Sequence, residues 1–458
     1  MRKLVRVAID RAVDVRSNTP TRRRRRLSST RAVVLCLIGL ASIVCHPEKA
    51  FSQEPFPPLS GQLAWEDAML SNWALRQDMA ERGISFFGVN QTMPFGNPVG
   101  GINRDFETTN RFTLQSHFDL EKLLNLKGSE FLVSGAQNNG ANLGQDVGTP
   151  YNPSTLFQPA ATRLWQFYFG QFFFDQQIHL KIGRIGANQN DFAYSPFEFG
   201  YASAAYDSAS TAMFQNYKGF GAEPIGQWGA RLAIQPHGRD DYLRLGVYNA
   251  FPPAFAGPDA LNRATANGLD LTLRPDIGAA YLAEYGYRLN QDPEDLGLPG
   301  IYKIGLIYDS SPFDRFDVPD RTKRGLYGAY LQAYQMVYRE AGGGNGSLQN
   351  DQGLKLWGSV GLHPDQKVAA FPYYLSWGMN YKGLLPGRDD DVLYFGNYYS
   401  FNSKYNPGDL ETQFEVSYIF QFAPWLQIGP DLQYVIRPGG TGEIDNALVL
   451  GLQSLVTF

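Results

Sequence analysis

Polar and apolar residues alternate strictly over ten positions between Arg111 and Leu120. Apolar residues occupy the even positions apart from Ser116, and polar residues occupy the odd positions. Only a strand separates the two sets, because successive side chains in a strand point to opposite faces of the sheet. The segments Ile178–Ile182 and Tyr242–Tyr248 follow the same pattern. The alternation therefore predicts strands with one apolar and one polar face.

Similar segments recur along the chain and bring the expected number of strands to about sixteen. Each strand with its connection then takes about 25 residues, as in bacterial membrane barrels. Short links such as Asp175-Gln176, His237 to Asp241 and Ala423-Pro424 alternate with long links near 138–163, 186–226 and 251–277. We expect the short links on the periplasmic side and the long ones outside; the link at 340–352 is longer than this scheme predicts. The further segments lie near 84–92, 130–137, 164–174, 227–236, 279–289, 301–309, 326–339, 353–361, 371–382, 391–400, 411–421, 425–436 and 447–458.

A secreted β-sandwich or propeller would also alternate, because each strand would pack one face on a second sheet. Two features favour a membrane barrel instead. The strands are about ten residues long, as a tilted membrane-spanning strand requires, and the last strand ends on Phe458, the kind of aromatic terminus that the barrel assembly machinery recognises. The 26 tyrosines and 31 phenylalanines suit the aromatic girdles of such a barrel. We predict an all-β, transmembrane antiparallel barrel.

Residues 1–52 are predicted to be a cleaved signal peptide. The basic run Arg22–Arg26 precedes an apolar stretch, Ala32–Cys45, of about fourteen residues, which is shorter than a spanning helix. Cleavage would leave a chain that begins near Phe51 or Gln53 and is exported by the general secretion route; a retained anchor is the alternative. Residues 53–83 are expected to hold a short periplasmic helix, which Gly83 ends, and residues 84–458 the barrel. Disorder before the barrel is the alternative to the helix.

The exported part is predicted to be acidic and free of cysteine. Both cysteines, Cys36 and Cys45, lie in the leader, and without the leader the net charge is near −13, which excludes a nucleic-acid partner. The remaining histidines have no zinc spacing such as H-E-x-x-H, and no G-x-S-x-G motif occurs. We therefore expect neither an enzyme nor a metal or cofactor site.

Charged and polar residues on the inward faces are the candidates for lining a pore and contacting a sugar. Sugar hydroxyls both donate and accept hydrogen bonds, so fixed cations and carboxylates can replace their water shell. A solvated wall or a structural ion pair is the alternative for each residue. The link 186–226 is either a constricting loop or a surface cap. Arg184 breaks phase with Ile178–Ile182, which suggests a bulge at Gly183 or the end of the strand. The candidates are Arg111, His117, Asp119, Lys181, Arg184, Arg231, Arg244, Glu284, Arg288, Trp357, Glu415, Asp431 and Gln433, with Lys303 and Lys355 also facing inward.

Several segments, in one order along the chain, resemble the carbohydrate-selective porins of the OprB type. The family implies sixteen strands and passive uptake of monosaccharides such as glucose, without chemistry on the solute. Where the family carries an acidic residue after a leucine, this chain has Gln166, so the charge of the pore can differ. The segments are Trp73–Arg76, Ala80–Ile84, Leu180–Arg184, Asp191–Ala193, Gln335–Arg339, Leu385–Asp391, Pro424–Leu426, Pro430–Tyr434 and Arg437–Gly440.

The predicted function is an outer-membrane porin for small sugars in a Gram-negative bacterium. A general or ion-preferring porin on the same barrel, and a non-conducting structural or adhesive barrel, are the alternatives. Expected partners are monosaccharides, outer-membrane lipid and lipopolysaccharide, and the barrel assembly machinery through Phe458. The barrel is expected to be a monomer or a homotrimer.

Overall fold

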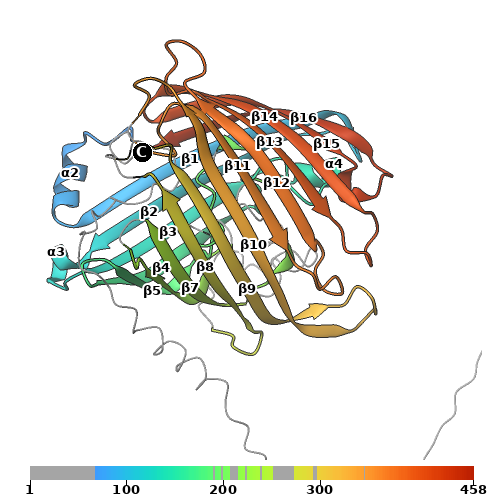
Figure 1. Cartoon of the computed structure of the whole chain (residues 1–458), viewed down its shortest axis with the longest axis horizontal. Coiled ribbons are helices and arrows are strands. Elements are labelled where there is room, and N and C mark those ends of the chain that lie inside the picture. The colour runs from blue at the N-terminus through green and yellow to red at the C-terminus, as the bar shows by residue number, and fades with distance from the viewer. Residues whose placement is uncertain are drawn as a thin grey trace, which may run out of the picture. The chain divides into compact units, whose positions relative to one another are not determined.

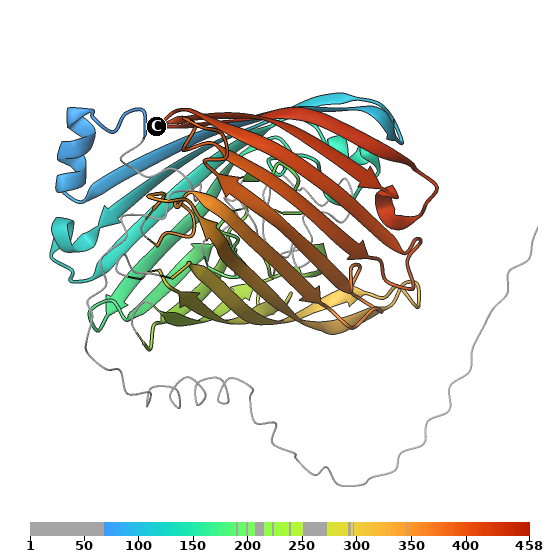
Figure 2. The same ribbon diagram turned by 45° about the horizontal axis from the view of Figure 1, so that its top comes forward.

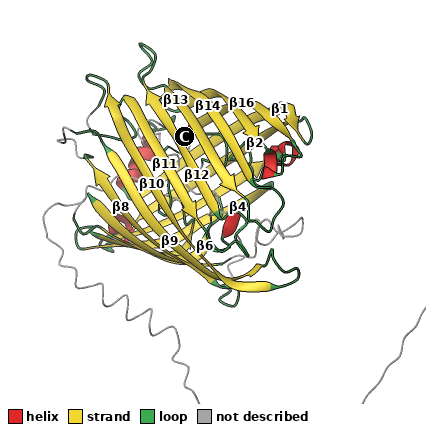
Figure 3. Ribbon diagram, turned by 45° about the vertical axis from the view of Figure 1, so that its right-hand side comes forward, coloured by secondary structure: helices red, strands yellow, loops and turns green. Residues whose placement is uncertain are grey.

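The computed structural model describes residues 68–188, 191–197, 200–206, 215–221, 224–237, 240–250, 273–291, 295, 297–344 and 346–458. All belong to one compact unit, His46–Phe458, whereas the unit Met1–Cys45 and the predicted signal peptide lie outside the described residues. The described part folds into sixteen antiparallel strands that close into a barrel (Figures 1 and 3). The predicted fold class and strand number are confirmed.

Each strand pairs with its neighbours in sequence, and the first strand pairs with the last. Val89 lies opposite Thr457 and Thr92 opposite Ser454, so the ladder has no free edge. The strands are β1 Ile84–Gly101, β2 Phe106–Asp119, β3 Ser129–Asn139, β4 Ala161–Phe173, β5 Ile178–Ile185, β6 Gln227–Ile234, β7 Asp241–Asn249, β8 Ala279–Leu289, β9 Gly300–Asp314, β10 Thr322–Arg339, β11 Gly353–Leu362, β12 Tyr373–Lys382, β13 Val392–Phe401, β14 Leu410–Ala423, β15 Leu426–Ile436 and β16 Asp445–Thr457.

The hairpins β1–β2 and β9–β10 are longer than predicted. Their ladders continue through register shifts, between Gly96 and Val99 in the pairing of β1 with β16 and between Arg324 and Leu326 in the pairing of β10 with β9. A shift of register interrupts the period of two. The outer parts of these strands therefore give no alternation that the sequence analysis could detect.

Within the described residues, the short helical segments are α2 Ala74–Glu81, α3 Leu120–Leu124, α4 Leu143–Val147 and the 3-10 turn η4 Pro438–Gly440. The helices α2 and α3 lie at one end of the barrel and α4 at the other (Figures 1 and 2). The helix α2 is shorter than expected, because Met69 donates its backbone N–H to Thr457 O (3.0 Å) and the chain turns before Ala74. No described helix has the length and apolar character needed to span a bilayer.

The outward positions of the strands form an apolar belt. On β9, Tyr302, Ile304, Leu306 and Tyr308 are between 39% and 58% exposed, while the residues between them point inward and are mostly buried. Such exposure of large apolar side chains would be unfavourable in water. In a bilayer, the same belt faces acyl chains.

Leu306→Arg should destabilise the barrel by about 2–4 kcal/mol, because a charged side chain on the lipid face is unfavourable near the bilayer centre. Leu306→Met serves as the control, since it keeps volume and apolarity. The free energy of unfolding is measured by guanidinium titration in phospholipid bilayers. An arginine variant as stable as the wild type would mean that β9 does not face hydrocarbon.

Candidate functional site

The β5–β6 loop, residues 186–226, crosses the interior of the barrel in its described parts. Near its start, the Ala193 N–H donates to Glu284 Oε2 on β8 (2.8 Å). Further on, the Ala202 N–H donates to Glu415 Oε1 on β14 (2.6 Å). Five strands, β9 to β13, lie between β8 and β14 on the shorter way around the barrel. The loop therefore lies in the lumen as a constricting loop rather than as a surface cap.

An aromatic cluster holds the middle of this loop against β11 and β13. The Trp357 Nε1–H donates to Tyr201 Oη (2.8 Å), and Tyr201 Oη donates to Phe395 O (3.0 Å). Tyr206 packs at 4.9 Å from the Tyr201 ring and 6.1 Å from the Trp357 ring. Trp357 is therefore occupied in anchoring the loop, with 8% of its surface exposed.

The β3–β4 loop, residues 140–160, also lies inside the barrel. Thr149 Oγ1 donates to Glu411 Oε1 on β14 (2.7 Å), and the Gln433 amide on β15 donates to Pro153 O (2.9 Å). The Thr155 N–H donates to Ala202 O (2.6 Å), so the two loops contact each other. Sequence reasoning treated 138–163 only as a long external link. The apolar residues Leu143, Val147, Tyr151 and Leu156 of this link, all buried in the structure, were the signal that could have indicated an internal position.

A cluster of charges fixes the start of the β5–β6 loop to the wall. Asp191 forms ion pairs with Arg231 (Nε to Oδ1, 2.8 Å) and with Lys181 (Nζ to Oδ2, 3.3 Å), and Arg244 donates to its backbone carbonyl. Burial alone would raise the pKa of Asp191, but Arg231 and Lys181 outweigh burial and lower it to about 2. The carboxylate therefore stays charged, and the anchor intact, over the physiological pH range.

Glu284 is the second anchor of this loop. It is completely buried, accepts from the hydroxyls of Tyr242 (2.9 Å) and Tyr330 (2.6 Å), and pairs with Arg244 at 3.5 Å. Together with the Ala193 N–H, these donors satisfy a carboxylate that would otherwise be very unfavourable in the interior. The guanidinium of Arg244 also lies 4.3 Å from the Tyr242 ring centroid.

A string of polar groups continues from this cluster along β5 and β3. Glu130 accepts from the Nε2–H groups of His117 and His179, each at 3.0 Å. It reaches across β4 at Gly170, where a Cβ atom would lie 2.4 Å from Glu130 Oε1. Arg231 Nη1 donates to His179 O (3.1 Å) and thus joins the string to Asp191.

The remaining predicted residues have different positions. Arg111 points inward and donates to Gln91 Oε1 (3.1 Å), and Arg288 lies over the Tyr242 ring at 5.2 Å. Asp431 accepts from the Gln433 amide (2.9 Å) within the wall. Asp119 lies at the end of β2, where it accepts from the N–H groups of residues 121 and 122 as the N-cap of α3. Lys303 donates to Tyr194 O, and Lys355 to Gln349 O and Asp351 O.

Arg184 is 2% exposed although its position in the strand register matches that of Phe167, which is 37% exposed. Gly183 beside it has φ +148°, and a Cβ there would lie 2.3 Å from Phe167 O. The pairing of β5 with β4 and β6 continues without a register shift. The change of phase therefore comes from the backbone conformation of Gly183 and not from a bulge.

Several residues of the interior were not among the predicted site residues. Four of these residues are less exposed than the outward-facing residues beside them or belong to, or contact, the inner loops. They are Glu130, Asp191, Tyr201 and Arg163. Glu130 occupies an inward position of an alternating strand, so alternation could have identified it. No group of three or more potential metal ligands occurs among the described residues.

The comparisons with known proteins agree with this architecture. The model of the family "Carbohydrate-selective porin, OprB family" matches residues 103–458. The chain belongs to this family. It is 26% identical to Porin B of Pseudomonas aeruginosa, over 92% of this chain and 97% of that protein. It is 22% identical to a putative porin, QuiX, of Acinetobacter baylyi, over 85% of this chain and 93% of that protein.

Solved OprB structures share the fold. The high-pH structure of Pseudomonas putida OprB has a TM-score of 0.75 at 24% identity and covers 86% of this chain and 100% of its own. The low-pH structure has a TM-score of 0.55 at 20% identity, over 86% of this chain and 98% of its own. Because the chain belongs to the family of carbohydrate-selective porins, it is an outer-membrane carbohydrate porin and a channel, which confirms the predicted family and function.

Glu284→Gln should loosen the β5–β6 loop, because it leaves Arg244 buried without its counter-charge and offers an amide N–H to groups that are themselves donors. Loss of one partner of a buried pair costs about 3–5 kcal/mol. We expect a lower free energy of unfolding and a larger, noisier single-channel conductance. Glu81→Gln on the exposed surface of α2 is the control. Wild-type conductance and stability in Glu284→Gln would show that this carboxylate does not hold the loop.

Acid should weaken the second half of the loop, where Tyr217 Oη lies 2.9 Å from His363 Nδ1. Burial lowers the pKa of His363 from 6.5 to about 3, so its contribution to stability is complete above pH 6.5 and is lost as the pH falls towards 3, by up to about 1.4 kcal/mol per unit. Amide exchange of residues 215–221, corrected for intrinsic rates, should accelerate between pH 7 and 4. His363→Gln should remove this dependence, and His237→Gln, at an exposed histidine, should keep it. Equal pH dependence in both variants would contradict the assignment.

Proposed function

We propose that the channel admits small neutral sugars of the glucose type by passive diffusion, and that the β5–β6 loop narrows the path. The observation that carries this proposal is the course of the loop, which is bonded to β8 by Ala193 and to β14 by Ala202. A sixteen-stranded barrel without such a loop would leave a wide aqueous channel with little selectivity. A loop bonded across the lumen reduces the opening to the size of a small solute.

The solute path in this proposal follows the wall of β1 to β4. Within the described residues, these contacts of the β5–β6 loop are with the other strands, through Lys181, Glu284, Trp357 and Glu415. Several predicted candidates are thus engaged in holding loops. We propose that the polar groups of the β1–β4 wall, Arg111 among them, line the solute path.

Arg111 is the proposed main contact of the sugar. Its guanidinium has five N–H donors in a planar fork, which suits vicinal hydroxyls. Its neighbour Gln91 holds the fork by one hydrogen bond of 3.1 Å.

We propose that the predicted leader directs export of the chain and is cleaved near Phe51 or Gln53. We also propose that the barrel assembly machinery recognises Phe458. Phe458 pairs with Gly88 through two backbone hydrogen bonds, with the Phe458 N–H donating at 2.8 Å and the Gly88 N–H donating at 3.3 Å. Its ring lies 6.4 Å from the Phe112 ring on the outer face. The terminal side chain is thus presented towards the membrane.

Planar-bilayer recording of the purified protein tests the function. Small conductance that glucose blocks supports the proposal. Large ohmic conductance without an effect of glucose would support a general or ion-preferring porin, and no conductance would leave a non-conducting barrel.

Arg111→Gln should weaken glucose block about tenfold or more, because a hydrogen bond from a charged group contributes about 1.5–3 kcal/mol. Its heat-modifiable gel mobility should stay that of a folded barrel. Arg82→Gln, on the exposed end of α2, is the control. Two further variants, Arg231→Ala and Arg244→Ala, distinguish residues that hold the loop from residues that contact the sugar. These variants should change conductance because they release Asp191. Unchanged glucose block in Arg111→Gln would remove Arg111 from the path.

A further inference from the structure

One end of the barrel carries large apolar side chains outside the strands. The helix α2 precedes β1 there, α3 joins β2 to β3, and a short turn joins β4 to β5, so these three elements follow one another along the rim (Figures 1 and 2). Short links lie on the periplasmic side of bacterial barrels, and we therefore take this end as the periplasmic one. Six side chains on or next to these elements are between 36% and 71% exposed, and we call them the apolar rim: Trp73, Leu75, Leu123, Leu124, Leu126 and Phe174.

Backbone hydrogen bonds connect the three elements directly. The Asp119 N–H, at the start of α3, donates to Gly83 O, at the end of α2 (2.8 Å). The Phe172 N–H, next to the β4–β5 turn, donates to Gly128 O, which follows α3 (2.8 Å). The apolar rim is therefore one continuous stretch of the surface and not a set of independent loops.

The helix α2 lies against the outer face of β1. Phe86 on β1 points outward, since its neighbour Phe87 is buried in an interior cluster that includes Trp165 on β4. The Trp73 ring lies 6.5 Å from the Phe86 ring, and the Arg76 guanidinium donates to Phe86 O (3.1 Å). Trp73 therefore extends the outer surface of the barrel beyond the start of β1.

The apolar rim continues the belt that faces hydrocarbon. The outward residues of β4 are aromatic from Phe167 to Phe173, apart from Gln171, and Phe174 follows them directly in the turn. The Gln171 amide is used within the protein, because it donates to Lys127 O (3.0 Å). The belt and the rim therefore form one apolar surface along β4.

Two lysines lie among the leucines of the apolar rim. Lys122 and Lys127 are both exposed, and neither forms an ion pair with a residue that the structure describes. The two carboxylates of the same segment are occupied: Asp119 accepts from the N–H groups at the start of α3, and Glu121 accepts from the Gly128 N–H (2.8 Å). Exposed ammonium groups next to apolar side chains are typical of segments that lie in the headgroup region of a membrane.

The other turns at this end lack the combination of apolar side chains and lysines without ion pairs. The β6–β7, β8–β9 and β10–β11 turns carry no exposed large apolar side chain among their described residues. The β12–β13 turn has two exposed leucines, but its cations are paired, Lys382 with Asp390 (3.2 Å) and Arg388 with Asp391 (2.7 Å). The β14–β15 turn has no cation in its sequence. Within the described turns, the combination therefore singles out the apolar rim.

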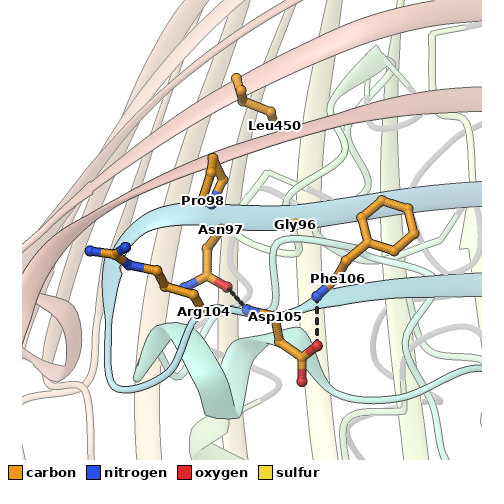
Figure 4. A pocket seen from close by; sticks show the side chains of 7 residues that line it. All are labelled: Gly96, Asn97, Pro98, Arg104, Asp105, Phe106 and Leu450. Carbon is orange, nitrogen blue, oxygen red and sulfur yellow. Dashed lines mark hydrogen bonds between the residues drawn. The ribbon is translucent and has the colours of Figure 1, made fainter.

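The opposite end of β1 and β2 has an apolar surface of another kind. A shallow hollow of about 590 Å³ is lined by Pro98, Phe106 and Leu450, among others (Figure 4). Arg104 and Asp105 are neighbours at its margin, so the cation there has a carboxylate beside it. Opposite charges side by side give little net attraction for an anionic headgroup.

We infer that the apolar rim lies in the periplasmic leaflet of the outer membrane, where Lys122 and Lys127 bind the phosphate groups of anionic phospholipid. The leucines and aromatic side chains of the rim enter between acyl chains beside the belt, and the two ammonium groups remain at the level of the headgroups. Each lysine then adds an attraction for phosphatidylglycerol over the zwitterionic phosphatidylcholine. A periplasmic protein is the other class of occupant, and the continuity of the rim with the belt favours lipid.

The depth of the apolar rim in the membrane tests this inference. Both native cysteines lie in the first 45 residues, so a spin label can be attached selectively in Leu124→Cys and, as the control, in His237→Cys on the exposed β6–β7 turn at the same end. In vesicles of phosphatidylcholine and phosphatidylglycerol, the label at position 124 should collide more often with oxygen than with a water-soluble nickel complex, because oxygen concentrates in hydrocarbon. The label at position 237 should show the reverse. Equal ratios at the two positions would overturn the inference and leave a periplasmic protein as the occupant; Leu126→Cys replaces Leu124→Cys if the latter does not fold.

A second experiment tests the two lysines. Lys122→Gln combined with Lys127→Gln should lower the preference for phosphatidylglycerol over phosphatidylcholine about fivefold for each lysine. Arg104→Gln, at the hollow of the opposite end, is the control. Native mass spectrometry of protein released from nanodiscs with equal amounts of the two lipids counts the lipids that remain bound. All three side chains are exposed, so both variants should fold, which heat-modifiable gel mobility checks.

Loss of the lipid preference in the double variant, together with its persistence in Arg104→Gln, supports the inference. An unchanged preference in the double variant, or an equal loss in Arg104→Gln, overturns it. Neither experiment involves glucose, so its failure would leave the proposed function of the pore intact.

Discussion

The whole architecture depends on one constraint, which is that every backbone N–H and C=O group in hydrocarbon must find a partner within the protein. The sixteen strands meet it by closing into a ring, in which β1 pairs with β16 as well as with β2. Because successive side chains of a strand point to opposite faces, closure gives every strand one face towards lipid and one towards the lumen. The outward side chains contact the acyl chains of the lipid. The inward side chains are polar in many positions and bind other parts of the chain.

The interior is organised by carboxylates that bind backbone amides of the inner loops. Glu284 accepts from Ala193, and Glu415 accepts from Ala202 and Ser203. A loop in a lumen has no ladder to pair with, and its N–H groups would otherwise need water. Charges that resemble solute contacts in the sequence therefore serve to position the loop, and the selectivity of the pore depends on them indirectly.

The strands could be predicted from the sequence because their signal is local. The pattern in Arg111–Leu120 needs no knowledge of the rest of the chain, and the count of sixteen was correct. The position of the inner loops could not be predicted in the same way. It depends on pairs such as Thr149 with Glu411, which are 262 residues apart, and neither residue type indicates its partner. The turn of Arg184 to the interior depended on the backbone of Gly183, which alternation does not reveal.

The backbone bonds that join the two ends of the chain also govern how the barrel can be made. Phe458 and Thr457, the last residues of the chain, bond to Gly88 and Met69 near its beginning. The ring therefore has no partly closed form that satisfies its first strand before synthesis of the last. A ribosome that stops before β16 would release a chain in which β1 and β15 both keep an open edge, so the loss of one short segment at the carboxyl end opens the whole ring.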